Sequence, residues 1–163
     1  MPEITDADDP LPVFIPEWSV WDIVITHHYE KVSMSAKNFM YALLQKRASA
    51  STELAYIPTE LYEALKGAFR SRPAFGFLIE NGATVEQLPE LFTKMLPHPL
   101  PHEVTVFYLA FWKMMNFRDV YIVTEDKDFK KILKQMNQVG IKFANLKIIN
   151  CKEASKKLDE IVD

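Results

Sequence analysis

The chain has 163 residues, a formal net charge of −3 and 48% hydrophobic residues. This length allows one hydrophobic core, and the composition is that of a globular protein rather than of a disordered segment. The net charge argues against strong nonspecific binding of nucleic acid over the whole surface, because such binding depends on lysine and arginine contacts with phosphate. The single cysteine, Cys151, excludes an internal disulfide framework and a cysteine-rich zinc site.

The N-terminal residues 1–10 contain four acids and no apolar period, so we expect a flexible acidic tail ahead of one domain over residues 11–163. An acidic start is unlike a signal or transit peptide, and no stretch approaches the roughly 18 apolar residues of a membrane span. Because a lone thiol also fits a reducing compartment, we expect a cytoplasmic protein.

The domain begins with a strand pattern and two helix patterns. Residues 12–15 form a short apolar run that predicts a strand, and apolar side chains then recur at helical spacing over residues 18–29. Ser33 and Ser35 are suitable caps for a further helix, which we predict over residues 36–48.

The middle of the chain contains a second strand pattern and several helix patterns. Residues 54–57 predict the strand, and residues 59–69 predict the helix that follows it. Two short helical patterns occupy residues 73–96, and prolines at 97, 99 and 101 then form a rigid connection. Residues 102–116 carry β-branched positions typical of a strand and an apolar stripe typical of a helix. Because the segment is longer than most strands, we predict a helix.

The last third of the chain has the clearest alternation of strands and helices. Residues 120–123 are continuously apolar and β-branched or aromatic, which is typical of a strand buried on both faces of a parallel sheet. A helix over residues 129–136 that ends near Gly140, a strand over residues 146–149 and a helix over residues 152–162 follow. The alternation predicts an α/β fold with a central parallel sheet.

Acidic residues stand at the positions where such a sheet binds ligands, which are the C-terminal ends of its strands and the helix starts nearby. A cluster of carboxylates without histidine or cysteine is the ligand set of a hard cation such as Mg²⁺ or Mn²⁺, and the chemistry that follows is hydrolysis. The candidate acids at these positions are Glu17, Glu60, Glu63, Glu103, Asp126 and Asp128.

Four of these acids can also be present for a structural reason. Asp126 is a suitable N-cap for the helix after it, and Glu60 and Glu63, which lie one turn apart on a helix, are ordinary residues for an exposed surface. Glu103 is favourable in the first turn of a helix without any ligand. Two further acids near strand ends are alternative ligands: Asp22 and Asp119.

Other candidate groups have simpler interpretations. His98 and His102 are separated by prolines that prevent a shared helical face, so they do not predict a zinc site, and neither do His27 and His28. Cys151 has no neighbouring base to activate it, and we expect a small, semi-buried residue beside the last strand.

The C-terminal region is locally basic. Residues 127–157 contain nine lysines against two acids, which is typical of the solvated faces of two amphipathic helices as well as of a binding surface. These lysines are Lys127, Lys130, Lys131, Lys134, Lys142, Lys147, Lys152, Lys156 and Lys157.

Four motifs together resemble those of the PIN domain, a family of metal-dependent nucleases. VTEDKDF at Val123–Phe129 closely matches the last acidic motif of that family. EWSVW at Glu17–Trp21 is similar to the opening Asp-Thr-Ser motif, with Glu17 in the Asp position and Ser19 kept. The resemblance covers nearly the whole chain after its acidic tail.

The two middle motifs of the family also have counterparts. IPTELYEAL at Ile57–Leu65 is similar to the second motif, whose acid falls on Glu63. EVTVFYLA at Glu103–Ala110 is similar to the Asp-to-Ala helix motif, with glutamate in place of aspartate.

The resemblance implies a single-domain three-layer sandwich with a central parallel sheet, and a metal-dependent endoribonuclease that hydrolyses RNA phosphodiester bonds with a metal-activated water. It implies Mg²⁺ or Mn²⁺ ligands at Glu17, Glu103 and Asp126. Glu63 would be a further ligand or a base, Asp128 would support the site, and Lys127 and Lys130 would hold phosphates. As the family includes toxins of prokaryotic toxin-antitoxin pairs, an antitoxin or other protein partner is implied, and a homodimer is expected from the many aromatic residues.

Glutamate replaces aspartate at two of these positions and adds a methylene to each ligand, which shifts a metal beyond what catalysis tolerates in many sites. The alternative is therefore a catalytically degenerate PIN-like module that binds RNA or a protein partner. A third possibility is an unrelated α/β protein with an acidic pocket.

Overall fold

The computed structural model describes residues 11–21, 31–49, 54–71, 81–90, 102–114, 118–138, 140 and 145–161. The acidic tail expected over residues 1–10 and the prolines at 97, 99 and 101 lie outside these ranges. None of the helices within them is both long and apolar enough to cross a membrane.

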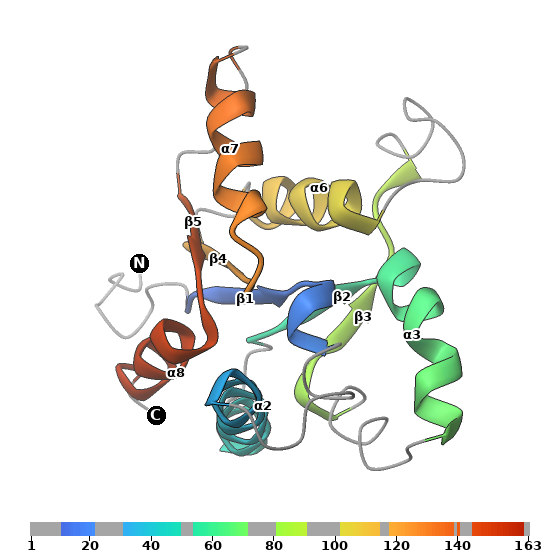
Figure 1. Cartoon of the computed structure of the whole chain (residues 1–163), viewed down its shortest axis with the longest axis vertical. Coiled ribbons are helices and arrows are strands. Elements are labelled where there is room, and N and C mark those ends of the chain that lie inside the picture. Colours follow the sequence, from blue (N-terminus) through green and yellow to red (C-terminus); the bar gives the residue numbers. More distant parts are fainter. Residues whose placement is uncertain are drawn as a thin grey trace, which may run out of the picture.

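Strands and helices alternate along the chain, and Figure 1 labels them. The elements are β1 (Val13–Pro16), α2 (Lys31–Ser49), β2 (Tyr56–Pro58), α3 (Thr59–Ser71), β3 (Thr84–Glu86), α6 (His102–Met114), β4 (Val120–Val123), α7 (Asp128–Gln138), β5 (Leu146–Ile149) and α8 (Cys151–Asp159).

All strand pairs are parallel. One sheet has the order β1-β4-β5, and a second pairs β2 with β3. An isolated bridge between Phe14 and Ala55 joins them, and the Phe14 amide donates to the Leu54 carbonyl at 2.8 Å. The resulting order is β3-β2-β1-β4-β5, so the chain turns from one side of β1 to the other between β3 and β4. The predicted α/β fold with a parallel sheet is confirmed.

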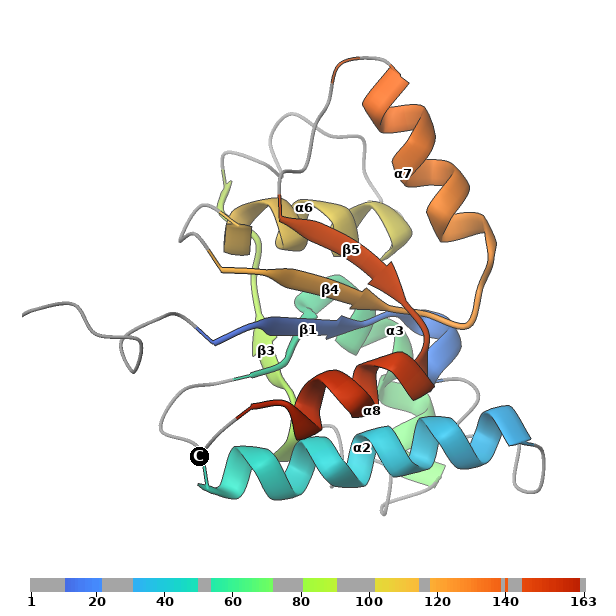
Figure 2. The ribbon, with the colours of Figure 1, turned by 90° about the vertical axis from the view of Figure 1, so that its left-hand side faces the viewer.

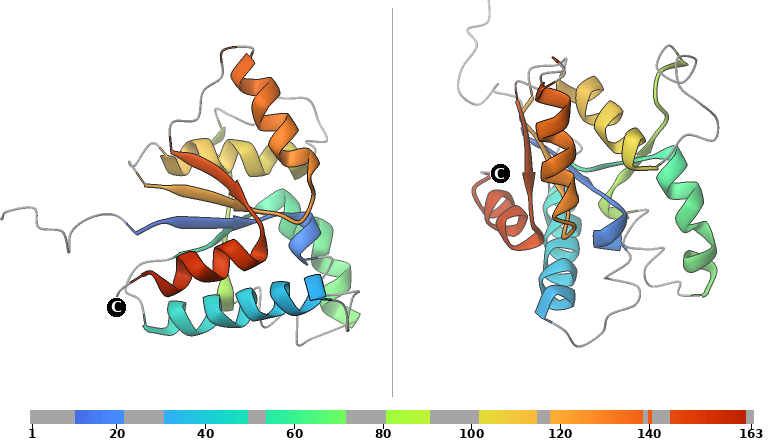
Figure 3. Two further views of the ribbon diagram at one scale, coloured as in Figure 1. Left: turned by 60° about the vertical axis from the view of Figure 1, so that its left-hand side comes forward. Right: turned by 45° about the horizontal axis from the view of Figure 1, so that its top comes forward.

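Helices lie on both sides of this sheet. In Figures 2 and 3, α2 and α8 run side by side below β1, whereas α6 and α7 lie on the side of the sheet opposite them. Strands β1 and β4 are buried along their whole length, as expected for the middle of a sheet that is covered on both faces. The ring of Phe14 on β1 stacks on Tyr121 of β4, with ring centroids 5.5 Å apart.

Most predicted elements are present, with bounds shifted by one or two residues, except that α2 begins five residues before its predicted start and α8 ends three residues before its predicted end. The ambiguous segment at residues 102–116 is a helix over His102–Met114, as its length predicted. The chain leaves α7 through Gly140, whose φ of 91° suits glycine, so the predicted end of this helix is confirmed. Of the helix predicted over residues 18–29, residues 18–21 are helical and the rest lie outside the described ranges.

Two predictions about local structure are wrong. Residues Thr84–Glu86 form strand β3, where a helical pattern was predicted, because three residues are too short for a period to distinguish strand from helix. Ser33 and Ser35 lie inside α2, which begins at Lys31, and therefore do not cap it. Serine costs little in a helix, so its presence does not mark the first turn.

Candidate functional site at the ends of β1 and β4

Glu17 and Asp126 follow two strands that are neighbours in the sheet. Glu17 comes directly after β1, and its amide donates to the Val123 carbonyl at the end of β4 at 3.0 Å. Asp126 lies three residues beyond that strand end. Both acids therefore stand at the C-terminal edge between β1 and β4, where the strand order reverses and where parallel sheets bind their ligands.

The carboxylate of Glu17 is buried and hydrogen-bonded. Glu17 as a whole residue is 2% exposed. Its Oε1 atom accepts from the Ser19 amide at 2.9 Å, from the Ser19 hydroxyl, and from the Thr124 hydroxyl at 2.6 Å. Burial raises the pKa of Glu17 above its ordinary value, the hydrogen bonds from Ser19 and Thr124 oppose this rise, and the charge of Asp126 adds to it.

Two hydroxyl groups connect Glu17 to the loop after β4. The Ser19 hydroxyl accepts from the Glu125 amide at 2.9 Å, and the Thr124 hydroxyl accepts from the Asp126 amide at 2.9 Å. Each hydroxyl thus contacts both the Glu17 carboxylate and the backbone of this loop. The network fixes the position of the Asp126 backbone relative to Glu17.

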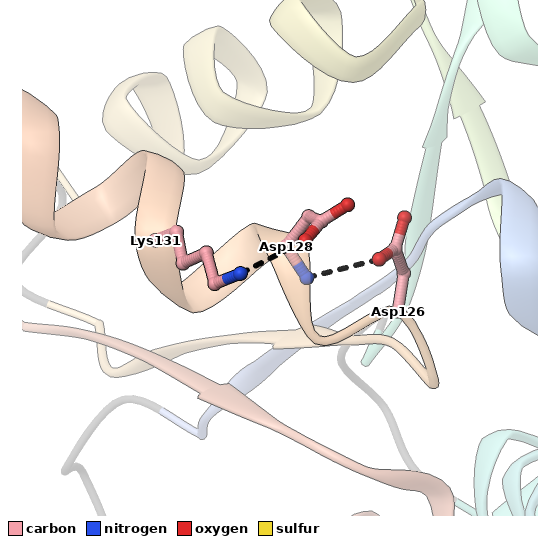
Figure 4. A network of polar contacts seen from close by, with 3 residues as sticks. All are labelled: Asp126, Asp128 and Lys131. Atoms are coloured by element: carbon pink, nitrogen blue, oxygen red, sulfur yellow. Dashed lines mark hydrogen bonds and ion pairs between the residues drawn. The ribbon is translucent and has the colours of Figure 1, made fainter.

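Asp126 is exposed and begins the loop into α7. Its Oδ1 atom accepts from the amide of Asp128, the first residue of α7, at 2.9 Å, so Asp126 stabilises the start of this helix from the position before the N-cap residue Lys127. Figure 4 shows the carboxylates of Asp126 and Asp128 on the same side of this loop. The Lys131 ammonium lies 3.6 Å from Asp128, but both side chains are more than 70% exposed, so this ion pair contributes little to stability.

The other predicted ligands are not grouped with these two acids in the described structure. Glu63 is exposed on α3, and Glu103 lies in the first turn of α6, with a side chain that is not among the described groups. Glu60 is partly buried, and its Oε2 atom lacks a hydrogen-bond partner among the described residues. Within those residues, no three side chains of histidine, cysteine, aspartate or glutamate are arranged to hold a metal ion.

Asp119, an alternative ligand in the sequence, lies at the wrong end of its strand. It directly precedes β4, and its carbonyl accepts from the Val13 amide at 2.8 Å at the start of β1. The candidate site is at the opposite end of both strands. Asp22 lies outside the described residues, as do His27, His28 and His98, so the histidine interpretations stay predictions.

An open pocket of about 440 Å³ lies beside Asp126, between the C-terminal ends of β4 and β5. The lysines predicted to hold phosphates, Lys127 and Lys130, both belong to its wall. Its complete lining is Thr124, Glu125, Asp126, Lys127, Lys130, Ile148, Ile149, Asn150 and Glu153.

Glu125 is a member of this site that the sequence interpretation did not assign. Its Oε1 atom accepts from the Cys151 amide in the first turn of α8 at 2.9 Å. This bond ties the loop after β4 to the loop after β5. The available signal was its position, because Glu125 is the second residue after a clearly predicted strand.

Cys151 is a fully buried free cysteine at the start of α8. Burial raises the pKa of its thiol, and the charge and hydrogen bond of Glu125 raise it further. A thiol in this state is a poor nucleophile. Cys151 lies beside the last strand as expected, but it is fully buried rather than semi-buried, because α8 packs its first turn into the core.

A second polar cluster joins α6 to the outer strands. The Lys113 ammonium lies 2.5 Å from Glu86 Oε2 on β3 and 3.7 Å from the ring centroid of Tyr56 on β2. Lys113 is 7% exposed, so its charge depends on this carboxylate and this aromatic face. No pattern in the sequence indicated this cluster, because its three residues come from three separate elements.

Comparisons of the chain with protein-family models, with curated proteins and with solved structures find no match.

Proposed function

We propose that the chain is a PIN-like endoribonuclease dependent on Mg²⁺ or Mn²⁺, with its metal centre at the C-terminal ends of β1 and β4 and a three-layer sandwich as its fold. The observation that carries this proposal is the hydroxyl of Thr124, which bonds both to the Glu17 carboxylate and to the Asp126 amide. It holds two acids together at the edge where parallel sheets of this strand order bind ligands.

The donor atoms of this edge fit a hard cation. Mg²⁺ is usually held by one or two carboxylates together with waters and substrate phosphate oxygens, so Glu17 and Asp126 are a sufficient protein contribution. Burial and the charge of Asp126 disfavour ionised Glu17, and a divalent cation between the two acids would reverse that penalty. Glu103, in the first turn of α6, is the third ligand in this proposal.

The residues of the chain position the reacting groups. Ser19 and Thr124 hold the Glu17 carboxylate in one orientation, and Lys127 and Lys130 bind phosphate oxygens of the RNA. When bound, the metal ion would supply a water of lowered pKa and stabilise the developing charge on the phosphate. Glu63 is proposed as a further ligand or a base.

The decisive experiment compares Asp126→Asn with Asp119→Asn. Asparagine keeps a side-chain oxygen that accepts from the Asp128 amide, so Asp126→Asn should fold normally but lose a metal ligand. We expect its Mn²⁺-dependent cleavage of a panel of single-stranded RNAs to fall at least about 100-fold, with weaker Mn²⁺ binding by calorimetry. Asp119→Asn, at the opposite end of the same strand, should cleave like the wild type.

Equal cleavage by Asp126→Asn and the wild type would show that this assignment is wrong. Cleavage that is lost equally in both variants would indicate an effect on folding rather than on a ligand. Circular dichroism and thermal unfolding of each variant separate these two causes.

A catalytically degenerate RNA-binding or protein-binding module is the second candidate. It is favoured by the three hydrogen bonds that already engage Glu17 Oε1 and by the lack of a three-residue metal group in the described structure. An absence of bound Mn²⁺ at millimolar concentration, together with retained RNA binding, would establish this alternative. The homodimer and the antitoxin partner stay predictions of the resemblance.

A further inference from the structure

The pocket beside Asp126 has walls of different chemical character. Lys127 and Lys130 line the side that belongs to the start of α7. Asn150 and Glu153 line the side that belongs to the start of α8. Between them, Ile148 and Ile149 at the end of β5 line the pocket, and only one of these two side chains can face it, because consecutive strand residues point to opposite faces of the sheet.

The two lysines have charge available for a ligand. Both side chains are exposed, and among the described residues neither takes part in an ion pair. An ammonium group without a protein partner, at the mouth of a pocket, is suited to a phosphate oxygen.

The acids of the pocket are engaged more fully than its lysines. Glu125 accepts from the Cys151 amide. Glu153 and Asn150 form a reciprocal capping box at the start of α8, in which the Asn150 side chain accepts from the Glu153 amide at 2.8 Å. These bonds keep the α8 wall in place, and the exposed Glu153 carboxylate presents hydrogen-bond acceptors there.

The size and lining of the pocket are suited to a small polar molecule with one apolar face. Its volume of about 440 Å³ lies within the roughly 300–1,000 Å³ of small-ligand sites. A nucleobase could lie against the isoleucine of β5 that faces the pocket, because the faces of all bases are apolar. An exocyclic amino group of adenine, cytosine or guanine offers a carboxylate two N–H donors, whereas uracil has no such group and offers only its ring N3–H.

We propose that this pocket binds one nucleotide of the RNA, next to the candidate metal centre at Asp126, and that it favours a base with an exocyclic amino group. Lys127 and Lys130 bind the phosphate, the isoleucine at the end of β5 that faces the pocket contacts the base, and Glu153 accepts from its amino group. Asp126 and Thr124 belong to both the pocket and the candidate metal centre, so the two sites share a wall. This assignment rests on the proposed function, whose substrate it specifies.

Binding of mononucleotides to the metal-free protein tests the pocket separately from cleavage. The probes are CMP, AMP, GMP, UMP, ribose 5-phosphate and inorganic phosphate, titrated with EDTA present and followed by backbone amide shifts in NMR spectra. We expect CMP to bind with a Kd on the order of 1 mM, at least about fivefold tighter than ribose 5-phosphate, inorganic phosphate or UMP.

Three variants locate the binding site. Lys130→Gln should weaken CMP binding roughly tenfold, the value of one charge-assisted hydrogen bond. Lys134→Gln removes an equally exposed lysine one turn further along α7, outside the pocket, and should stay within about twofold of the wild type. Glu153→Gln keeps the capping box, because glutamine also serves at this position, and should remove the preference for CMP over UMP.

The outcomes that overturn the proposal are distinct from failure of the proposed function. Inorganic phosphate that binds as tightly as CMP, equal losses in Lys130→Gln and Lys134→Gln, or no binding by any probe would each overturn it. RNA cleavage without CMP binding would overturn this inference alone. CMP binding that follows the expected pattern in a protein without nuclease activity would leave the pocket supported and the proposed function wrong.

Discussion

The Thr124 hydroxyl donates to the Glu17 carboxylate at 2.6 Å, across two neighbouring parallel strands and 107 residues of sequence. The same hydroxyl accepts from the Asp126 amide at 2.9 Å. One side chain therefore satisfies a buried acid and positions the loop that carries the exposed acid.

Thr124→Val should test this relationship, because valine has nearly the same shape but no hydroxyl. The Glu17 carboxylate would lose a buried donor, and the Asp126 amide would lose its acceptor. We expect the free energy of unfolding in urea to fall by about 1–3 kcal/mol. Thr124→Ser, which keeps the hydroxyl, should lose less than half of that amount, and equal stabilities of the valine and serine variants would contradict the role assigned here.

The pH dependence of stability should change in Glu17→Gln. Burial raises the pKa of Glu17, so the folded protein keeps a proton at pH values where the unfolded chain has released it. The stability from this group is therefore complete below the ordinary pKa of glutamate and is lost as pH rises through the raised pKa. Because glutamine does not ionise, the free energy of unfolding of Glu17→Gln should rise relative to the wild type as the pH increases above the ordinary pKa of glutamate. Parallel stability profiles of the two proteins would exclude this coupling.

Asp126 should stabilise the start of α7 independently of any metal. Asp126→Ala removes the acceptor for the Asp128 amide, so we expect a loss of about 1 kcal/mol in the free energy of unfolding. Asp126→Asn keeps an acceptor and should lose only a few tenths of a kcal/mol. Thermal or urea unfolding in EDTA measures both values, and a greater loss for asparagine than for alanine would refute this role.

Removing Glu86 while Lys113 remains should destabilise the protein, because the buried lysine charge would lose its partner. Glu86→Gln leaves a 7% exposed ammonium without its carboxylate, and we expect a loss of roughly 2–3 kcal/mol. This expected loss in the free energy of unfolding is smaller than that for a fully buried ion pair, because the Glu86 side chain is 27% exposed. The double variant Lys113→Met with Glu86→Gln should recover part of the loss, since the unpaired charge is gone. A double variant less stable than Glu86→Gln would argue that Lys113 contributes mainly through Tyr56.

Local patterns are sufficient to predict the strands that carry the site. Val120–Val123 is predictable because four consecutive apolar residues that are β-branched or aromatic favour a buried strand strongly, and Leu146–Ile149 is predictable for a similar reason. Strand β3, Thr84–Glu86, could not be predicted, because three residues of intermediate or full exposure carry no period. Its identity as a strand depends on pairing with β2, which is a tertiary contact.

The acids of the site could be predicted more readily than their partners. Position after a strand identified Glu17 and Asp126, but the donors to Glu17 come from Ser19 close by and from Thr124 more than a hundred residues away. The pocket was also inaccessible to sequence reasoning, because Lys130 and Asn150 meet only when β4 and β5 pair. Sequence periodicity indicates which residues share a face, whereas these contacts depend on which strands become neighbours.

Within the described residues, one bridge between Phe14 and Ala55 joins the two parts of the sheet. Every residue of β4 is paired on both sides, with β1 and with β5, whereas β2 and β3 are joined to β1 through this bridge and the hydrogen bond from Phe14 to Leu54. Separating the β2–β3 pair from β1 should therefore cost less free energy than global unfolding. In native-state hydrogen exchange, the amides of Tyr56 and Val85 should exchange through such local opening, before those of Tyr121 and Ile122. The unit of β1, β4 and β5, which should open more slowly, then carries Glu17, Thr124 and Asp126. Helix α3, which carries Glu63, belongs with β2 and β3 and should open earlier.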